Sequence, residues 1–280
     1  MISAEEEAYI ADRAYVPEHV VSLMAVISKG EPFLVDDHLC FAKDDWVIFV
    51  GYPLGGNFGV GDFERALDAA VKRFRPRHLW FIAPEVPPSL ARSCRDRESD
   101  HYYRLELKGI EVKKSLKRLV EKASGNVTVE KGGRLSKAHE ELIDEFLKRE
   151  MPNPRIRALF LSMAEYVAQS DSAVVLSAID REGRVAAFYV VELAAKAFAT
   201  YVVGCHSKVH YVLGASDLLF SEMVNLARDR GKAYVHLGLG VNEGIRRFKE
   251  KWGGVPFLRY EFCRRTRHRF FPPGPLMSRL

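Results

Sequence analysis

The sequence predicts an α+β protein of two similar halves, each a mixed, mostly antiparallel sheet flanked by helices. Strand-like and amphipathic helical segments alternate along the whole chain, and the same order of elements occurs twice. The length of 280 residues is sufficient for two domains that each bury a core. A content of 48% hydrophobic and 28% charged residues is typical of a globular protein and excludes disorder as the main state.

The second half shows the order most clearly. Two amphipathic helices come first, over 137–149 and 155–169. Three strand-like runs follow and predict an antiparallel meander, over 173–180, 184–193 and 197–204. The remaining elements alternate between helix and strand: a helix over 214–231, a strand over 234–240, a helix over 242–252 and a strand over 256–263. From about residue 127 the order is therefore ααβββαβαβ.

The first half repeats this order more weakly. Three strand-like runs are followed by alternating helices and strands, which we place at 22–28, 33–41, 45–52, 63–74, 78–82, 88–94 and 102–107. An amphipathic helix over 110–123 joins the two halves. We accordingly expect a degenerate first domain over 1–109, a connector over 110–126 and a second domain with a basic tail over 127–280.

Cysteine spacing and hydropathy favour a cytoplasmic protein, with peripheral attachment to a membrane left open. The four cysteines lie far apart, so neither a zinc ribbon nor a disulfide framework is expected, and a reducing cytosol fits. The acidic N-terminus does not resemble a secretory signal. The most apolar window, 186–205, contains Glu192 and Lys196 and predicts two strands rather than a membrane span.

Positive charge is concentrated at the C-terminus. Residues 245–280 contain ten Lys or Arg against Glu250 and Glu261, a balance of +8, whereas the whole chain carries +5. This concentration favours an anionic partner, either a phosphorylated cofactor, an RNA or a lipid surface, while a merely solvated tail remains the alternative. Basic residues beside aromatic ones suit stacking on RNA or contact with a membrane, and this segment has both: Arg264, Arg265, Arg267, Arg269, Phe270 and Phe271.

The order ααβββαβαβ, with a glycine in the turn before its central helix, resembles the GNAT N-acyltransferase superfamily. The resemblance implies that an acyl donor lies where two parallel strands diverge, here 197–204 and 234–240. Two such domains in one chain are similar to the FemAB-like group, which includes peptidoglycan-bridge and phosphatidylglycerol aminoacyltransferases. The segment GIRRFKEKWGG from Gly244 to Gly254 looks like the G-x-x-R-F-K-x-x-(W/F)-G-G segment of that group.

The turn before the central helix bears on the donor. In members that use acetyl-CoA, this turn binds the pyrophosphate, which makes Gly214, Ala215 and Ser216 the candidate cofactor-binding residues here. The leading basic or amide residue is missing, Ser216 is placed to cap the helix, and Asp217 adds a negative charge in the first turn. We expect no tightly bound cofactor and favour a donor other than CoA, with aminoacyl-tRNA and acyl-CoA both left open.

The resemblance implies catalytic roles for Lys249 and Phe248. Ile245, Phe248 and Trp252 form an apolar helix face, and Lys249 lies beside it. We expect its ammonium to be partly desolvated near the strand opening, where it would stabilise an oxyanion. The alternative is a lysine whose ammonium extends into solvent.

Other candidates depend on the same opening. His236, in the strand over 234–240, points either into the opening or into the core. Glu192 and Tyr201 border the opening as candidate proton relays. Arg118, Arg246 and Arg247 are the candidate substrate-binding residues. His206 and His210 lie in a loop without a third ligand, so no metal site is expected.

These observations favour an N-acyltransferase or aminoacyltransferase that transfers an activated acyl group to an amine by direct attack. An acetyl-CoA-dependent GNAT acetyltransferase is the first alternative. The second is a non-catalytic GNAT pair that binds RNA or an anionic surface. The sequence leaves the identity of donor and acceptor, and the oligomeric state, open.

Overall fold

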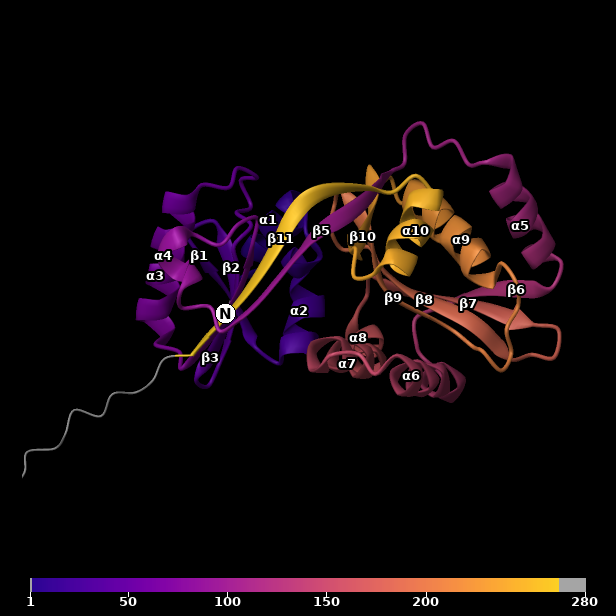
Figure 1. The fold of residues 1–280 in the computed structure, drawn as a ribbon, viewed down its shortest axis with the longest axis horizontal. Coiled ribbons are helices and arrows are strands. Elements are labelled where there is room, and N and C mark those ends of the chain that lie inside the picture. Colours follow the sequence, from indigo (N-terminus) through magenta and orange to yellow (C-terminus); the bar gives the residue numbers. More distant parts are fainter. Residues whose placement is uncertain (1, 267–280) are drawn as a thin grey trace, which may run out of the picture.

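The computed structural model describes residues 2–266, in which eleven strands form one sheet that runs through both halves (Figure 1). The order across the sheet is β1-β2-β3-β4-β11-β5-β10-β9-β8-β7-β6. The strands are β1 Glu31–Val35, β2 His38–Lys43, β3 Trp46–Val50, β4 His78–Ala83, β5 Asp96–Glu106, β6 Val127–Gly132, β7 Ala173–Asp180, β8 Val185–Glu192, β9 Phe198–His206, β10 Tyr234–Leu239 and β11 Val255–Thr266.

Helices cover both faces of the sheet. They are α1 Ala4–Arg13, the short 3₁₀ helix η1 Pro17–His19, α2 Val21–Ser28, α3 Val60–Phe74, α4 Pro88–Ala91, α5 Lys114–Ser124, α6 Lys137–Glu150, α7 Pro154–Leu161, α8 Met163–Gln169, α9 Ala215–Asp229 and α10 Glu243–Lys251. In the second half, α6, α7 and α8 lie on one face and α5, α9 and α10 on the other (Figure 1). Every residue of β8 is buried as a result, which explains its continuous apolar sequence.

The two halves exchange their last strands. The chain's final strand, β11, pairs antiparallel with β4 of the first half, and β5 of the first half pairs antiparallel with β10 of the second. β5 and β11 also pair with each other along most of their length at the centre of the sheet (Figure 1). The predicted α+β class is confirmed, and the domain boundaries at 109 and 127 stay a prediction because the sheet is continuous across them.

Most elements of the second half lie where the sequence predicts them. The meander β7-β8-β9 is antiparallel, β9 pairs parallel with β10, and α9, α10 and β11 follow in the expected order. Two details differ. The single helix expected over 155–169 is divided at Ser162 into α7 and α8, and β6 adds an edge strand that the sequence analysis missed.

The first half differs more from the expectation. The predicted strand over 22–28 is wrong, because this apolar segment forms α2 and packs between two cores, which removes the one-sided pattern that marks a surface helix. The predicted strand over 33–41 is the hairpin β1-β2, whose turn places Asp36 at a positive φ of 51°. The first helix, α1, was missed.

One disulfide corrects the interpretation of the cysteines. Cys94, after α4, bonds to Cys263 of β11, 169 residues away, while Cys40 and Cys205 are free and buried. Sequence spacing did not reveal this pair because the two cysteines meet only when β11 enters the sheet beside β4.

Within residues 2–266, no helix combines the length and apolar character that crossing a bilayer would require.

Candidate active site

The strands β9 and β10 separate after a short parallel pairing. Tyr234, Val235 and His236 pair with Phe198, Ala199 and Thr200. Beyond this point β9 continues to His206, whereas β10 shifts its register at Gly238, whose φ is 70°, and ends at Leu239. Thr200 and His236 therefore stand opposite each other at the last paired position before the opening.

Two buried polar atoms at this position lack a protein partner. Thr200 Oγ1 and His236 Nε2 make no hydrogen bond to any residue that the structure describes. His236 Nδ1 accepts a hydrogen bond from the Gly238 N–H at 3.1 Å, so the neutral ring carries its proton on Nε2. Burial, assisted by the charge of Lys249, lowers the pKa of His236 to about 3 and keeps the ring neutral. An unsatisfied buried donor costs about 1–3 kcal/mol and is typical of a ligand site.

Lys249 is the most perturbed cation of the opening. The helix α10 begins at Asn242, whose side chain caps the Ile245 N–H at 2.9 Å. Two turns later Lys249 is only 4% exposed, and its ammonium donates to the Leu239 carbonyl at the end of β10. Burial lowers the pKa of Lys249 to about 7, against the weaker attraction of Asp100. The ammonium is therefore desolvated, and more deeply than the sequence analysis expected; its contacts are with the end of β10 and with the Tyr103 ring of β5, at 5.5 Å.

The other residues of α10 divide differently from the expectation. Phe248 and Trp252 pack against Phe220 of α9 with ring centroids 5.5 and 4.7 Å apart. Ile245 does not join them and is 37% exposed, because the end of α10 where it lies projects from the sheet into solvent. Phe248 therefore supports the position of α10.

The three candidate substrate-binding arginines lie on two separate helices. Arg246 is half-buried beside Gly240, and the exposed Arg247 forms an ion pair with Glu243 in its own helix. Arg118 is exposed on α5, a helix that packs on α9 and β6 instead of α10. The fold therefore gives the three arginines no common binding surface.

The N-terminus of α9 is covered. Gly214 caps this helix at a φ of 83°, and a Cβ there would lie 3.0 Å from Leu119 Cδ1 of α5. The expected capping role of Ser216 is wrong: Ser216 lies within the first turn, its side chain makes no cap, and its carbonyl accepts from the Tyr189 hydroxyl at 2.8 Å. Ala215 is buried. Leu119 of α5 thus lies directly against Gly214 at the start of α9.

The geometry does not support proton relay by Glu192 or Tyr201. The buried Glu192 carboxylate accepts from the Tyr166 hydroxyl and from the backbone N–H groups of Leu193 and Ala194, so its oxygens already have partners. Tyr201 follows Thr200 and therefore faces the other side of the sheet, where its ring meets Tyr189 at 4.8 Å. Burial raises the pKa of Tyr201.

A second polar group near the opening was missed by the sequence analysis. Glu18 of η1 accepts a hydrogen bond from the Tyr102 hydroxyl at 2.8 Å, and the Tyr102 ring lies 4.9 Å from the His236 ring. Tyr52 and Tyr260 flank Tyr102 at 5.8 and 5.3 Å. These residues come from four distant segments that share no motif, so the sequence contains no signal that joins them.

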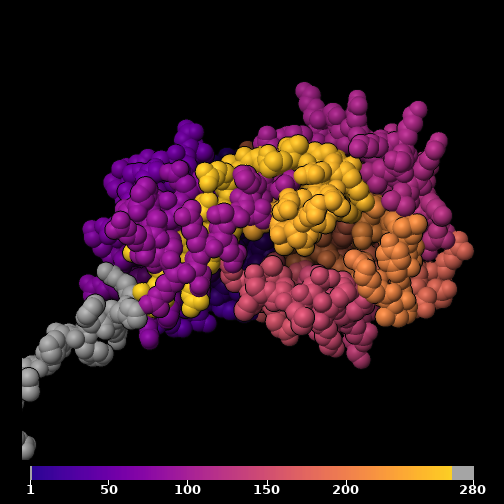
Figure 2. All heavy atoms as spheres, viewed as in Figure 1, coloured from indigo at the N-terminus to yellow at the C-terminus, as the bar shows by residue number. Residues whose placement is uncertain are grey.

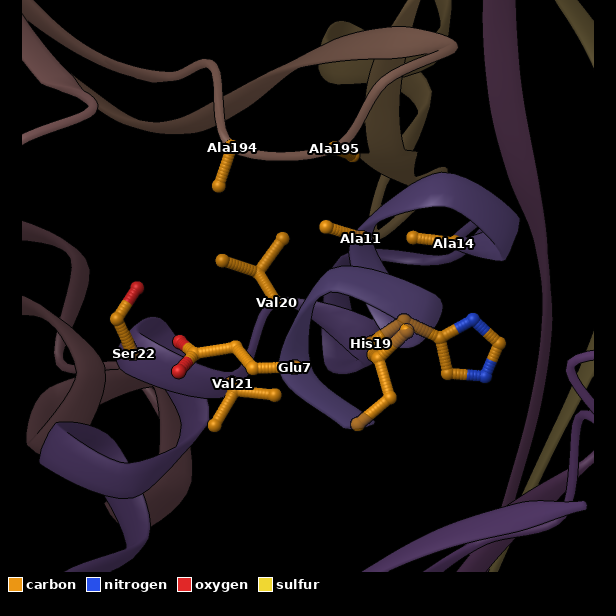
Figure 3. Close-up of a pocket in the computed structure, with 10 residues that line it drawn as sticks. Glu7, Ala11, Ala14, His19, Val20, Val21, Ser22, Ala194 and Ala195 are labelled. Atoms are coloured by element: carbon orange, nitrogen blue, oxygen red, sulfur yellow. The ribbon is translucent and has the colours of Figure 1, made fainter. Parts of the chain in front are cut away.

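A small cavity away from the opening carries less chemistry. A small cavity of about 40 Å³ lies between α1, the start of α2 and the loop after β8, and is lined mainly by Ala and Val side chains (Figure 3). His19 lines it, but its Nε2 bonds to the Tyr52 carbonyl at 2.9 Å. In the part of the chain that the structure describes, no three His, Cys, Asp or Glu side chains are grouped to hold a metal ion.

Comparison with protein families shows the class to which this fold and opening belong. The model of the Acetyltransferase (GNAT) domain matches residues 111–250, half of the chain. The chain therefore belongs to the GNAT acetyltransferase family, and the reaction class of this family is acyl transfer. A search of the curated proteins finds no match.

Solved structures share the tandem fold at low sequence identity. The C-terminal domain of a putative lysylphosphatidylglycerol synthetase from Agrobacterium fabrum has a TM-score of 0.61 at 15% identity, covering 93% of this chain and 92% of that domain. FemX has a TM-score of 0.61 at 9% identity, with 93% and 96% covered. A tandem GNAT protein from the clavulanic acid pathway has a TM-score of 0.52 at 12% identity, with 94% of each chain covered.

Proposed function

We propose that this protein is an aminoacyl-transferring GNAT enzyme of the FemAB-like kind, which transfers an acyl group from an ester donor to an amine. The observation that carries the proposal is the buried Lys249 ammonium at the end of β10, which donates to the Leu239 carbonyl, lies 5.5 Å from the Tyr103 ring and lowers the pKa of His236. The last paired position of β9 and β10 supplies two buried polar atoms without a partner among the described residues, His236 Nε2 and Thr200 Oγ1. Hydrogen-bond donors already in place in a water-poor site are the means by which acyl-transfer enzymes stabilise an oxyanion.

The proposed reaction is a direct attack. The neutral amine forms a bond to the ester carbonyl carbon, negative charge develops on the carbonyl oxygen, and the ester C–O bond breaks. The nitrogen loses one proton, and the departing oxygen gains one. The Lys249 ammonium supplies a positive charge for the oxyanion, while His236 Nε2–H and the Thr200 hydroxyl are the donors available to the acyl group.

Charge and packing favour a donor other than CoA. Leu119 covers the N-terminus of α9, and Asp217 places a carboxylate in its first turn. In contrast, α5 and the residue before it expose a row of cations, none of which forms an ion pair with another described residue: Lys113, Lys114, Lys117 and Arg118. Such a row suits the phosphates of a tRNA, whose binding would weaken with salt.

The basic tail contributes little to this argument. Arg264 pairs with Asp96 at 3.2 Å, and the remaining residues of the tail that the sequence singled out lie outside the described residues: Arg267, Arg269, Phe270 and Phe271.

The decisive experiment measures amide formation from aminoacyl-tRNA. Lysyl-tRNA is the first donor to test, because lysine is the residue named in the putative synthetase among the structural neighbours. With n-butylamine as a surrogate acceptor, mass spectrometry quantifies the lysine butylamide formed above the uncatalysed rate. We expect Lys249→Ala to lower the enzyme-dependent rate at least about 100-fold, and the exposed Lys43→Ala to leave it unchanged.

Two outcomes would overturn the proposal. If no aminoacyl-tRNA yields enzyme-dependent amide, the aminoacyl donor is wrong. If the Lys249→Ala enzyme is as fast as the wild type, Lys249 has no part in transfer. Amide formation from acetyl-CoA, with a thermal shift on adding CoA, would instead select the acetyl-CoA-dependent reaction.

A further inference from the structure

The surface is hollowed between the two halves. Figure 2 shows the hollow between the atoms of β11 and α10 (yellow) and those of α7 and α8 (pink), with atoms of the N-terminal segment (indigo) deep inside it. Along the chain, Glu18 lies in η1 and Tyr260 in β11. Arg155 of α7 reaches across to the β11 side, where its guanidinium lies 3.7 Å from the Phe262 ring centroid.

A half-buried carboxylate meets three buried tyrosine rings here. Glu18 retains solvent exposure, whereas Tyr52, Tyr102 and Tyr260 are buried. The Tyr102 hydroxyl donates to the Glu18 carboxylate, and the Tyr52 and Tyr260 rings lie 5.8 and 5.3 Å from the Tyr102 ring. The negative charge of Glu18 raises the pKa of all three phenols. The Glu18 carboxylate is therefore enclosed by the tyrosine rings, while the residue as a whole keeps some exposure at the surface.

Glu18 has no cationic partner in the described part of the chain. Its side chain accepts hydrogen bonds from Tyr102 and from its own backbone, and takes part in none of the ion pairs found among residues 2–266. Arg155 forms an ion pair with Glu98, and its side chain also hydrogen-bonds to Tyr260. Burial raises the pKa of Glu18 to about 7, and the Tyr102 hydrogen bond opposes this shift. An unpaired carboxylate beside aromatic rings is the arrangement that recognises an ammonium ion.

The cluster of Glu18 and the three tyrosines adjoins the last paired position of β9 and β10. Tyr102 contacts Glu18 through its hydroxyl and His236 through its ring, and His236 is close enough to Lys249 for the lysine charge to lower its pKa. The Tyr102–His236 pair thus lies between the Glu18 carboxylate and the Lys249 ammonium. An acceptor amine beside Glu18 and Tyr102 would be close to an acyl group held by His236, whose ring contacts that of Tyr102.

We propose that Glu18, Tyr52, Tyr102 and Tyr260 form the acceptor subsite, which binds a primary alkylammonium and in which Glu18 takes its proton. Binding is an inference independent of the reaction, and the role of base rests on the proposed function. In the chemical step an N–H proton of the ammonium passes to the Glu18 carboxylate, and the freed lone pair of the nitrogen forms the bond to the acyl carbon. The ester C–O bond breaks, and the departing oxygen takes up the second proton that the nitrogen loses as the amide forms.

Calorimetric titration with n-butylammonium chloride tests the binding. We expect saturable binding to the full-length wild type at pH 8 and at least tenfold weaker binding to Glu18→Gln, which keeps the shape of the side chain and removes its charge. Glu5→Gln makes the same change at an exposed position of α1 and should bind as the wild type does. The neutral 1-butanol should not bind. Equal affinities for wild type and Glu18→Gln, or no saturable binding to the wild type, would overturn the subsite.

The pH dependence adds a readout that a purely structural role would not change. Butylammonium stays charged up to about pH 10, so its binding should strengthen as pH rises through 7 and Glu18 ionises. The hydroxyls of the three tyrosines stay neutral in this range because their pKa values are raised, and burial keeps His236 neutral. His19, the neighbour of Glu18 on η1, is neutral as well because burial lowers its pKa to about 4.

The pKa of Lys249 is also about 7, so Lys249 can contribute to the pH dependence of butylammonium binding. The pH dependence that remains in Glu18→Gln measures this contribution. Tyr102→Phe keeps the ring and removes the hydroxyl that lowers the pKa of Glu18. The midpoint of the binding profile should therefore move to higher pH in this variant. An unchanged midpoint would contradict the assignment.

The subsite and the proposed function fail in different ways. Butylammonium binding that Glu18→Gln abolishes, with no amide formed from any aminoacyl-tRNA, would retain the subsite and remove the transferase. Amide formation that is lost in Lys249→Ala and unaffected in Glu18→Gln, both in KM for butylamine and in kcat, would retain the transferase and remove the subsite.

Discussion

The indole Nε1–H of Trp252 donates to Asp217 Oδ1 at 3.0 Å, which joins the end of α10 to the first turn of α9. The same carboxylate forms an ion pair with Lys251 at 2.6 Å. Because Trp252 also stacks on Phe220, α10 is held against the sheet at the position from which Lys249 reaches the Leu239 carbonyl. The tryptophan of the GIRRFKEKWGG segment therefore positions the lysine.

Replacing Trp252 by Phe should lower the free energy of unfolding by about 1–3 kcal/mol, because the buried Asp217 loses a neutral donor. Urea denaturation measures the change. Trp80→Phe is the matched control, because the Trp80 indole N–H makes no hydrogen bond to another described residue. This variant should lower the free energy of unfolding by less than Trp252→Phe does. Equal losses in the two variants would show that the Asp217 bond contributes nothing.

Lys249→Met should stabilise the protein most at low pH. The pKa of Lys249 is about 7 in the folded chain against an ordinary 10.5. Between pH 7 and pH 10.5 the Lys249 side chain is protonated in the unfolded chain and neutral in the folded chain, so the free energy of unfolding rises with pH. Below pH 7 the side chain is charged in both states, and the full cost of burying this charge is present. The gain is at most about 5 kcal/mol and should disappear toward pH 10.5. Unfolding curves from pH 6 to 10 test this, and a variant as pH-dependent as the wild type would contradict it.

Gly214→Ala should destabilise the fold more than Gly183→Ala does. Both glycines have a positive φ, 83° and 78°, so both variants incur about 1–2 kcal/mol of backbone strain. Only the Cβ at 214 meets a neighbour, Leu119 of α5, while the Cβ at 183 meets nothing within 4 Å. A larger fall in Tm for Gly214→Ala would verify that α5 covers this helix end. Equal falls would mean that the N-terminus of α9 is open.

Reduction of the Cys94–Cys263 bond should lower the free energy of unfolding by about 2–5 kcal/mol, because the bond closes a long loop of the unfolded chain. In protein unfolded without reductant, iodoacetamide should label Cys40 and Cys205 alone, as peptide mass spectrometry would show. Alkylated Cys94 in that sample would remove the disulfide.

Local pattern was sufficient where an element has one apolar face or clear end signals. The strand β7 matches its predicted range, and α10 begins at the Asn242 cap and ends before Gly253, as its sequence indicates. Pattern failed for α2, which two cores enclose, and for β1 and β2, where no Gly or Pro marks the turn at Asp36. The site shows the same division: the motif predicted Lys249, while Thr200 and Glu18 have no local signal.

The amino-acid order alone determined the α+β class, the succession of elements in the second half and a lysine beside the apolar face of α10, because these depend on periodicity and capping over a few residues. Only the tertiary structure decided that β5 and β11 exchange partners, that Cys94 meets Cys263, that Glu192 is fully engaged, and that Glu18 faces three tyrosines. These contacts join segments far apart in the chain. Their formation depends on strand pairing and burial, which no short stretch of sequence contains.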